Sequence, residues 1–156
     1  MPAPTAGYVK NMIRRSFREL VDPSPTRKEV QAIWQFFCSQ CAYCGKEINK
    51  ARKEGHIDHL VSSARGGSNN VSNRVLSCAT CNEKEKLDMP WEDFLAQKSH
   101  DTIAASRRKK RILKWRSKHK MTMPKKEVLL GVDSLSKEVI KLYDEKVQQA
   151  RQLRNL

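Results

Sequence analysis

The chain begins with two segments whose apolar side chains recur at the spacing of a helix. Residues 8–20 place apolar residues on one face, and residues 26–37 do so again after a break that contains two prolines, at 22–25. Thr26 and Glu29 have the spacing of a capping box, which marks the start of the second segment. The pattern predicts two amphipathic helices before residue 40.

After residue 54 the spacing of apolar side chains changes from that of a helix to that of a strand. Residues 55–61 alternate and include β-branched side chains, and Val75-Leu76 has the character of a second, shorter strand. Between the two, residues 62–72 are rich in serine, glycine and asparagine, which is typical of a loop. A short helix from about Thr80 to Lys86 should follow the second strand.

Helical periodicity returns in the last third of the chain. We expect a helix that begins near Pro90, a basic and weakly amphipathic helix from Thr102 to about Lys118, and a break at Pro124. A final helix from Ser134 to about Arg154 carries an apolar stripe that suits a core or a dimer seam. The stripe consists of Leu135, Val139, Leu142, Tyr143, Val147, Ala150 and Leu153.

Positive charge is concentrated in one part of the chain. Lys and Arg number 31 against 17 Asp and Glu, a net charge of +14, and residues 101–126 hold eleven basic residues with Asp101 as the one acid. This balance predicts a polyanionic partner, nucleic acid before membrane. A basic protein with no specific partner is the alternative, and the concentration of charge argues against it. No apolar run reaches membrane-spanning length, and the first residues lack the features of a signal peptide.

Four of the five cysteines form two Cys-x-x-Cys pairs, Cys41/Cys44 and Cys78/Cys81. This spacing predicts a closed tetrahedral zinc site, which is structural because no coordination position remains for a substrate. It also suits a reducing cytoplasm better than a disulfide framework. Cys38 could replace a ligand in principle, but Cys41 and Cys44 are followed by the glycine that such a turn needs. We expect Cys38 to be a small core residue.

A polar cluster lies between the two cysteine pairs. Hydrolysis of a phosphodiester needs a deprotonated water and positive charge near the phosphate. His59 suits the role of base, and Asp58 and Asn82 offer the oxygen ligands that a hard divalent cation takes. His56 shares a strand face with Asp58 and could be an additional ligand; an ordinary strand histidine, hydrogen-bonded nearby, is the alternative.

These residues, with Arg65-Gly66-Gly67-Ser68, Asn73 and Leu76, resemble the HNH endonucleases, whose active site is a ββα-metal motif. The resemblance covers roughly residues 41–95. It implies that His59 is the general base, that Asn73 orients this base across the loop, and that Asp58 and Asn82 hold Mg²⁺ or a similar divalent ion. It also implies a structural zinc. Members often have lysine three residues after the asparagine, where this chain has Glu85 flanked by Lys84 and Lys86.

The fold class that we predict is α+β and mostly helical: a small zinc-clamped ββα-metal core, 41–98, between an N-terminal helical segment, 1–40, and a basic helical extension, 99–156. The function that we predict is that of a metal-dependent endonuclease acting on double-stranded DNA. A non-catalytic zinc-ribbon module that binds nucleic acid, and a nuclease acting on structured RNA, are the alternatives. The expected nucleic-acid contacts are Arg65, Lys84, Lys86, Arg107, Arg108, Lys109, Lys110, Arg111 and Lys114. A homodimer is possible, because the stripe on the last helix could be its seam.

Overall fold

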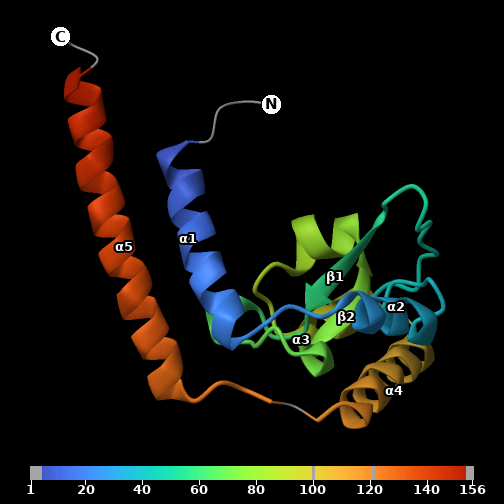
Figure 1. The fold of residues 1–156 in the computed structure, drawn as a ribbon. Helices are drawn as coiled ribbons and strands as arrows, with labels where there is room; N and C mark the ends of the chain where they lie inside the picture. Colours follow the sequence, from blue (N-terminus) through green and yellow to red (C-terminus); the bar gives the residue numbers. More distant parts are fainter. Residues whose placement is uncertain (1–4, 100, 121, 154–156) are drawn as a thin grey trace. The chain divides into compact units, whose positions relative to one another are not determined.

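The computed structural model describes residues 5–99, 101–120 and 122–153. These described residues form two strands and five α-helices (Figure 1), and a short π-helix, Thr80–Lys86, follows the second strand. The elements are α1 (Ala6–Val21), α2 (Arg27–Phe36), β1 (Gly55–His59), β2 (Arg74–Cys78), α3 (Trp91–Lys98), α4 (Thr102–Lys118) and α5 (Lys126–Leu153). The predicted α+β, mostly helical class is confirmed. The chain divides into a central unit, Ser24–Met123, and a terminal unit made from both ends of the chain.

The central unit is built on an antiparallel hairpin. β1 pairs with β2 so that Gly55 lies opposite Cys78 and His59 lies opposite Arg74. The loop between the strands contains two 3₁₀ turns, Ser63–Arg65 and Val71–Asn73. The amide of Leu60 donates to the carbonyl of Asn73 at 2.8 Å, which continues the hairpin one step into the loop. The predicted strand over 55–61 therefore ends at His59, where the loop begins.

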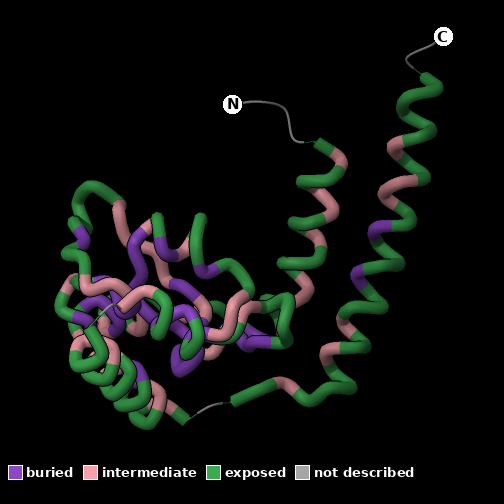
Figure 2. Tube along the Cα trace, turned by 180° about the vertical axis from the view of Figure 1, so that it is seen from behind, coloured by how far each residue is buried: buried purple, intermediate pink, exposed green. Residues whose placement is uncertain are grey.

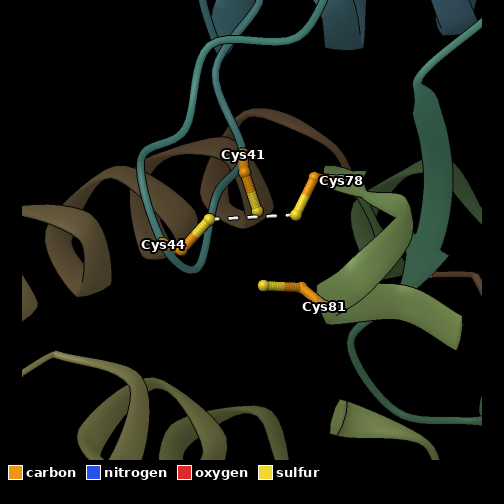
Figure 3. Close-up of side chains that lie close together, drawn as sticks. All are labelled: Cys41, Cys44, Cys78 and Cys81. Carbon is orange, nitrogen blue, oxygen red and sulfur yellow. Dashed lines mark hydrogen bonds between the residues drawn. The ribbon is translucent and has the colours of Figure 1, made fainter. Parts of the chain in front are cut away.

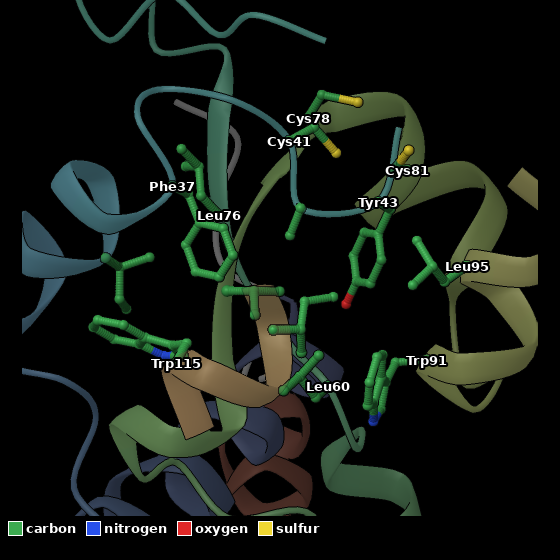
Figure 4. Packing of buried hydrophobic residues seen from close by; sticks show 14 of the residues in the cluster. Phe37, Cys41, Tyr43, Leu60, Leu76, Cys78, Cys81, Trp91, Leu95 and Trp115 are labelled. Carbon is green, nitrogen blue, oxygen red and sulfur yellow. The ribbon is translucent and has the colours of Figure 1, made fainter. Parts of the chain in front are cut away.

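Helices α2, α3 and α4 pack their apolar faces around this hairpin (Figure 4). The capping box predicted for α2 is present, since Glu29 Oε2 accepts from the backbone of Thr26 at 2.8 Å and Thr26 accepts in return. On α4, the indole of Trp115 donates to the carbonyl of Val71 at 3.1 Å. The largest fully buried side chains include Trp91, Tyr43, Phe37, Lys86, Ile33, Leu60, Leu76, Leu95 and Ile112. Most buried residues belong to this unit, as Figure 2 shows.

The terminal unit consists of α1 and α5, which run antiparallel side by side (Figure 1). Lys10 forms an ion pair with Asp144 at 2.7 Å between them. α5 begins at Lys126, so the predicted start at Ser134 is wrong; Gly131 weakens the helix, by about 1 kcal/mol relative to alanine, without ending it. The predicted end at Arg154 lies outside the described residues.

The apolar stripe predicted on the last helix is only partly buried, because Tyr143 and Val147 are half-buried and most of its other members are exposed. Leu135, Val139 and Leu142 are exposed, whereas Ser136 and Ile140 are the buried residues of α5. The buried pair is offset by one residue from Leu135 and Val139, so a core position is wrong for these exposed residues and for Leu142, and a dimer seam remains a prediction. None of the helices in the described ranges is both long and apolar enough to cross a bilayer.

Candidate functional site

Four cysteine sulfur atoms converge at one end of the hairpin (Figure 3). All four lie within 4.8 Å of one another, and the Sγ atoms of Cys44 and Cys78 are 3.8 Å apart. A tetrahedron of zinc–sulfur bonds of about 2.3 Å has sulfur–sulfur edges of about 3.8 Å. The donor set and its spacing therefore fit a zinc ion, and the predicted cluster of four cysteines is confirmed.

The local chain conformation explains why the cysteines meet. Cys41 and Cys44 lie in a turn closed by the amide of Gly45, which donates to the carbonyl of Cys41 at 2.9 Å. Gly45 has a φ of +76°, a conformation that other residues adopt only with strain, so glycine is favoured here. The other two ligands come from the end of β2 and from the first turn of the π-helix.

Close contact among the thiols separates the pKa values of Cys41, Cys44 and Cys81. Hydrogen bonds from Cys44 and Cys81 lower the pKa of Cys41, so its sulfur ionises readily. The same contact with Cys41 raises the pKa of Cys44 to about 11, and it is also the main cause of the raised pKa of Cys81. Zinc binds thiolates, so its binding would displace the protons that these sulfurs share.

Cys38 lies outside the cluster. The chain enters a left-handed conformation at Cys38 and Ser39, with φ near +51° and +54°, directly after α2. This turn leaves the thiol exposed. Our expectation that Cys38 is a core residue is wrong.

His59 is the last residue of β1, and both nitrogens of its ring are engaged. Nδ1 lies 3.1 Å from a guanidinium nitrogen of Arg74, and Nε2 lies 3.0 Å from Oδ1 of Asn69. Arg74 also donates to Asn69 Oδ1 at 2.6 Å, which closes a ring of contacts around the imidazole. Arg74 is the residue opposite His59 in the strand register, so the hairpin itself sets this arrangement.

Asn73 holds the two ends of the inter-strand loop together. Its side-chain amide donates to the carbonyls of Val61 and Ser68 at 2.9 and 2.8 Å, and its Oδ1 accepts from the amide of Val61 at 3.0 Å. The side chain is buried and acts on backbone groups only two residues beyond His59. A residue in this place fixes the position at which β1 ends.

Asp58 lies on the opposite face of β1 from His59 and points into the core. Its Oδ2 accepts from the hydroxyl of Tyr43 at 2.8 Å and pairs with the ammonium of Lys86 at 3.3 Å. Lys86 also donates to the carbonyl of His59 at 2.6 Å. Burial raises the pKa of Asp58, against the effect of Lys86, and burial followed by the charge of Asp58 raises the pKa of Tyr43.

The π-helix runs beside β1 and carries Asn82 in its first turn. Oε1 of Glu83, the next residue, lies 3.4 Å from Nε2 of His56. His56 precedes Asp58 by two positions and shares its face of β1. Asn82 is half-buried. Glu85 points away and pairs with Lys98, whereas Lys86 turns into the core.

The expected nucleic-acid contacts divide into two groups. Lys86 is 1% exposed and its ammonium is bound inside the protein, so it cannot reach a nucleic acid in this structure and that expectation is corrected. Arg108 donates to the carbonyl of Tyr43 at 3.2 Å, and Arg111 donates to that of Phe36 at 2.6 Å; these two hold α4 against the core. The remaining positions are exposed: Arg65, Lys84, Arg107, Lys109, Lys110 and Lys114.

Three residues of the site were missed in the sequence. Arg74, Asn69 and Tyr43 surround His59 and Asp58, yet none belongs to a spacing pattern that singles it out. Arg74 had one usable signal, which is that an arginine directly after a loop asparagine begins a strand whose other residues are uncharged. Only the strand register reveals that it faces His59.

Residues 41–87 match the model of the HNH endonuclease family. The match begins at Cys41 and ends one residue after the π-helix, so it covers the four-cysteine cluster, the hairpin and the loop between its strands. No curated protein matches the chain. The match implies a nuclease-type function that acts on nucleic acid, and the four-cysteine cluster suggests zinc.

Proposed function

We propose that the protein is a divalent-metal-dependent endonuclease that hydrolyses phosphodiester bonds of double-stranded DNA. One observation carries the proposal: within the HNH-matched segment, His59 ends β1 beside a loop that Asn73 holds closed. A binding module needs the zinc cluster, but it has no need of an imidazole fixed at a strand end next to a buried carboxylate.

In this proposal His59 takes a proton from the attacking water, and Asn73 keeps the base in place through the loop. Asp58 and Asn82 would hold the divalent ion, since carboxylate and amide oxygens are ligands that Mg²⁺ accepts. Tyr43 and Lys86 both contact Oδ2 of Asp58, so these two contacts do not occupy its other oxygen. Such an ion would supply positive charge to the phosphate and the leaving oxygen. His56 remains an additional candidate ligand, although its contact with Glu83 supports the hydrogen-bonded alternative.

The exposed cations give the proposal its binding surface. Arg107, Lys110 and Lys114 recur on α4 at helical spacing and stay exposed while other basic residues of the helix pack inward. Contacts from such residues to phosphates are independent of base sequence and depend on salt concentration. Arg65 and Lys84 are the corresponding candidates on the loop and on the π-helix.

A nicking assay tests the function. The zinc-loaded protein is incubated with supercoiled plasmid with and without Mg²⁺, because a chelator would also remove zinc. We expect Mg²⁺-dependent relaxation that His59→Ala abolishes and that the matched histidine variant His119→Gln retains. Plasmid that stays supercoiled but is bound by wild type and His59→Ala alike would establish the zinc-ribbon alternative. A panel of duplex DNA and structured RNA of equal length decides between the two nuclease readings.

We also propose that α5 mediates a homodimer. Val132, Leu135, Val139 and Leu142 follow the alternating three- and four-residue spacing of a coiled coil, with valine and leucine in the positions that two-stranded coiled coils favour. Three of these four side chains are exposed in the single chain. Sedimentation analysis of wild type and of Leu135→Lys/Leu142→Lys tests this: a monomeric wild type contradicts it, and a dimer that the double variant dissociates supports it.

A further inference from the structure

Leu87, the residue after the π-helix, combines a strained backbone conformation with an exposed apolar side chain. Its φ is +45° and its ψ is −118°, angles that glycine adopts freely and a bulky residue rarely adopts. The residue is 61% exposed, so packing in the core gives little return for this strain. Strained residues of this kind cluster at active sites and ligand contacts, which makes Leu87 a candidate for a role in binding.

Contacts on both sides of Leu87 hold this turn against the proposed active site. The ammonium of Lys86 donates to the carbonyl of His59 at 2.6 Å, and the carbonyl of Asp88 accepts from the guanidinium of Arg65 at 3.4 Å. The turn is therefore tied both to the end of β1 and to the loop that follows it. An apolar side chain is thus exposed one residue from the lysine that bonds the backbone of the proposed base.

The surroundings of Leu87 are polar and include exposed cations that suit phosphates. Lys84 is exposed on the π-helix and Arg65 on the loop, and the two glutamates of the π-helix each pair with a basic side chain. Cations bind the phosphates of a nucleic acid, whereas a leucine finds apolar contact only at bases and sugars. Leucine is also among the residues that proteins insert between stacked bases, which unstacks the step and kinks the duplex.

We propose that Leu87 inserts between two stacked bases beside the phosphate that is cut and opens this step while the nucleic acid is bound. This role rests on the proposed function and adds a preference among its substrates. Because unstacking takes free energy, the protein favours steps that unstack easily, which are mismatched pairs and the flexible pyrimidine–purine steps. Such selectivity needs no hydrogen bond to a base.

Cleavage of two duplexes that differ in one mismatched pair at the mapped position of the cut tests the preference. With Mg²⁺ and limiting protein, wild type should cut the mismatched duplex about tenfold faster, because the mismatch removes part of the unstacking cost. Leu87→Ala should cut the two duplexes at similar rates. Leu87→Met keeps a flexible apolar side chain and should keep most of the preference. Leu130→Ala is the matched control, since Leu130 is a 59% exposed leucine on α5, and it should cut like wild type.

Fluorescence of 2-aminopurine tests the insertion without catalysis, because this base brightens when it unstacks. The base is placed at the cut position, and the zinc-loaded protein is added to saturation without Mg²⁺. Wild type and Leu130→Ala should raise the fluorescence. Leu87→Ala should raise it several-fold less, although anisotropy shows that the duplex is equally saturated.

Zinc content and thermal unfolding separate a contact with substrate from a purely structural role. Leu87→Gly removes the side chain and the strain together, so it should unfold at no lower temperature than Leu87→Ala and still lose the preference. A folded Leu87→Gly protein that keeps the preference overturns the role of Leu87, even where Leu87→Ala fails to fold.

The outcomes separate this role from the function beneath it. Wild type that leaves every duplex intact overturns both. Wild type that cuts, with His59→Ala inactive and with the same preference and fluorescence in Leu87→Ala, overturns only the role of Leu87. Wild type that cuts the matched and mismatched duplexes equally fast overturns it as well.

Discussion

Replacement of Lys86 by methionine removes the ammonium that contacts Asp58 and His59 at the end of β1. The side chain is 1% exposed, and its ammonium lies 2.6 Å from the carbonyl of His59 and 3.3 Å from Oδ2 of Asp58. Methionine keeps much of the volume but leaves the carboxylate of Asp58 with Tyr43 as its one donor among these contacts. Removal of one partner from a buried ion pair costs about 3–5 kcal/mol. This is a large part of the roughly 5–15 kcal/mol that stabilises a domain.

Urea denaturation followed by tryptophan fluorescence measures this cost. All three tryptophans lie in the central unit, so the signal reports on that unit. The double variant Asp58→Asn/Lys86→Met removes both charges and should recover at least about 1 kcal/mol of the loss, because contacting residues are coupled. Lys84→Met, on the exposed side of the same helix, should change stability by no more than about 0.5 kcal/mol. The reasoning would be refuted if Lys86→Met changed the free energy of unfolding as little as Lys84→Met does. It would also be refuted if the effects of Asp58→Asn and Lys86→Met simply added in the double variant.

Three further outcomes are expected. Loss of zinc should unfold the central unit, because structural zinc contributes about 10–16 kcal/mol in small domains. Circular dichroism should show this unfolding for Cys81→Ser and for wild type treated with a chelator. Cys38→Ser should stay folded, because the thiol of Cys38 lies outside the cluster. Removal of one phosphate-binding cation from α4 should reduce the slope of log DNA affinity against log salt concentration by about 0.9. Fluorescence anisotropy with labelled DNA should show this for Lys110→Ala. Arg108→Ala should mainly lower the unfolding temperature, because Arg108 donates to the carbonyl of Tyr43. Burial raises the pKa of Asp58, so the folded state binds this proton more tightly than the unfolded state does. The free energy of unfolding should therefore fall as the pH rises from the ordinary carboxyl pKa through the raised pKa. Denaturation at several pH values without added Mg²⁺ should show this fall for wild type relative to Asp58→Asn, and a rise would contradict it.

The local pattern was enough to predict most of the central unit. Spacing alone predicted the four-cysteine cluster and the capping box of α2, and the residue pattern predicted the two strands, because each depends on residues close in the sequence or on a metal that demands a fixed geometry. The same reasoning misplaced Cys38, whose exposure follows from two consecutive left-handed residues that no composition signals. It also began α5 too late, because Gly131 interrupts the helical pattern without breaking the helix.

Tertiary contacts determined what the pattern could not give. A run of basic residues predicted one binding surface, yet Arg108 and Arg111 donate to backbone carbonyls of the core while their neighbours remain exposed. Which members of a charged helix turn inward depends on the acceptors that lie opposite. In the same way, the partners of His59 come from the strand across from it and from the loop, so they are visible only once the register is known.

The winding of the helix after β2 explains why a lysine at an unexpected position enters the core. The HNH endonucleases that the chain resembles often carry lysine three residues after the asparagine, and this chain has Glu85 there and Lys86 one residue later. The segment Thr80–Lys86 is a π-helix, which turns less per residue than an α-helix. The fourth residue after Asn82 therefore comes near the direction that the third would have in an α-helix.

The swapped variant Glu85→Lys/Lys86→Glu tests whether the direction that a position of the π-helix faces determines which residue must be lysine. If direction decides, the swap cannot restore the ion pair with Asp58, and it also places a second carboxylate beside the first in a buried site. We expect it to be at least as unstable as Lys86→Met in the urea assay. Glu85→Lys alone removes only a partly exposed pair with Lys98 and should cost about 0–1 kcal/mol. A swapped protein as stable as wild type would mean that the helix rewinds to admit lysine at 85, and the π-helix would then not be what selects Lys86.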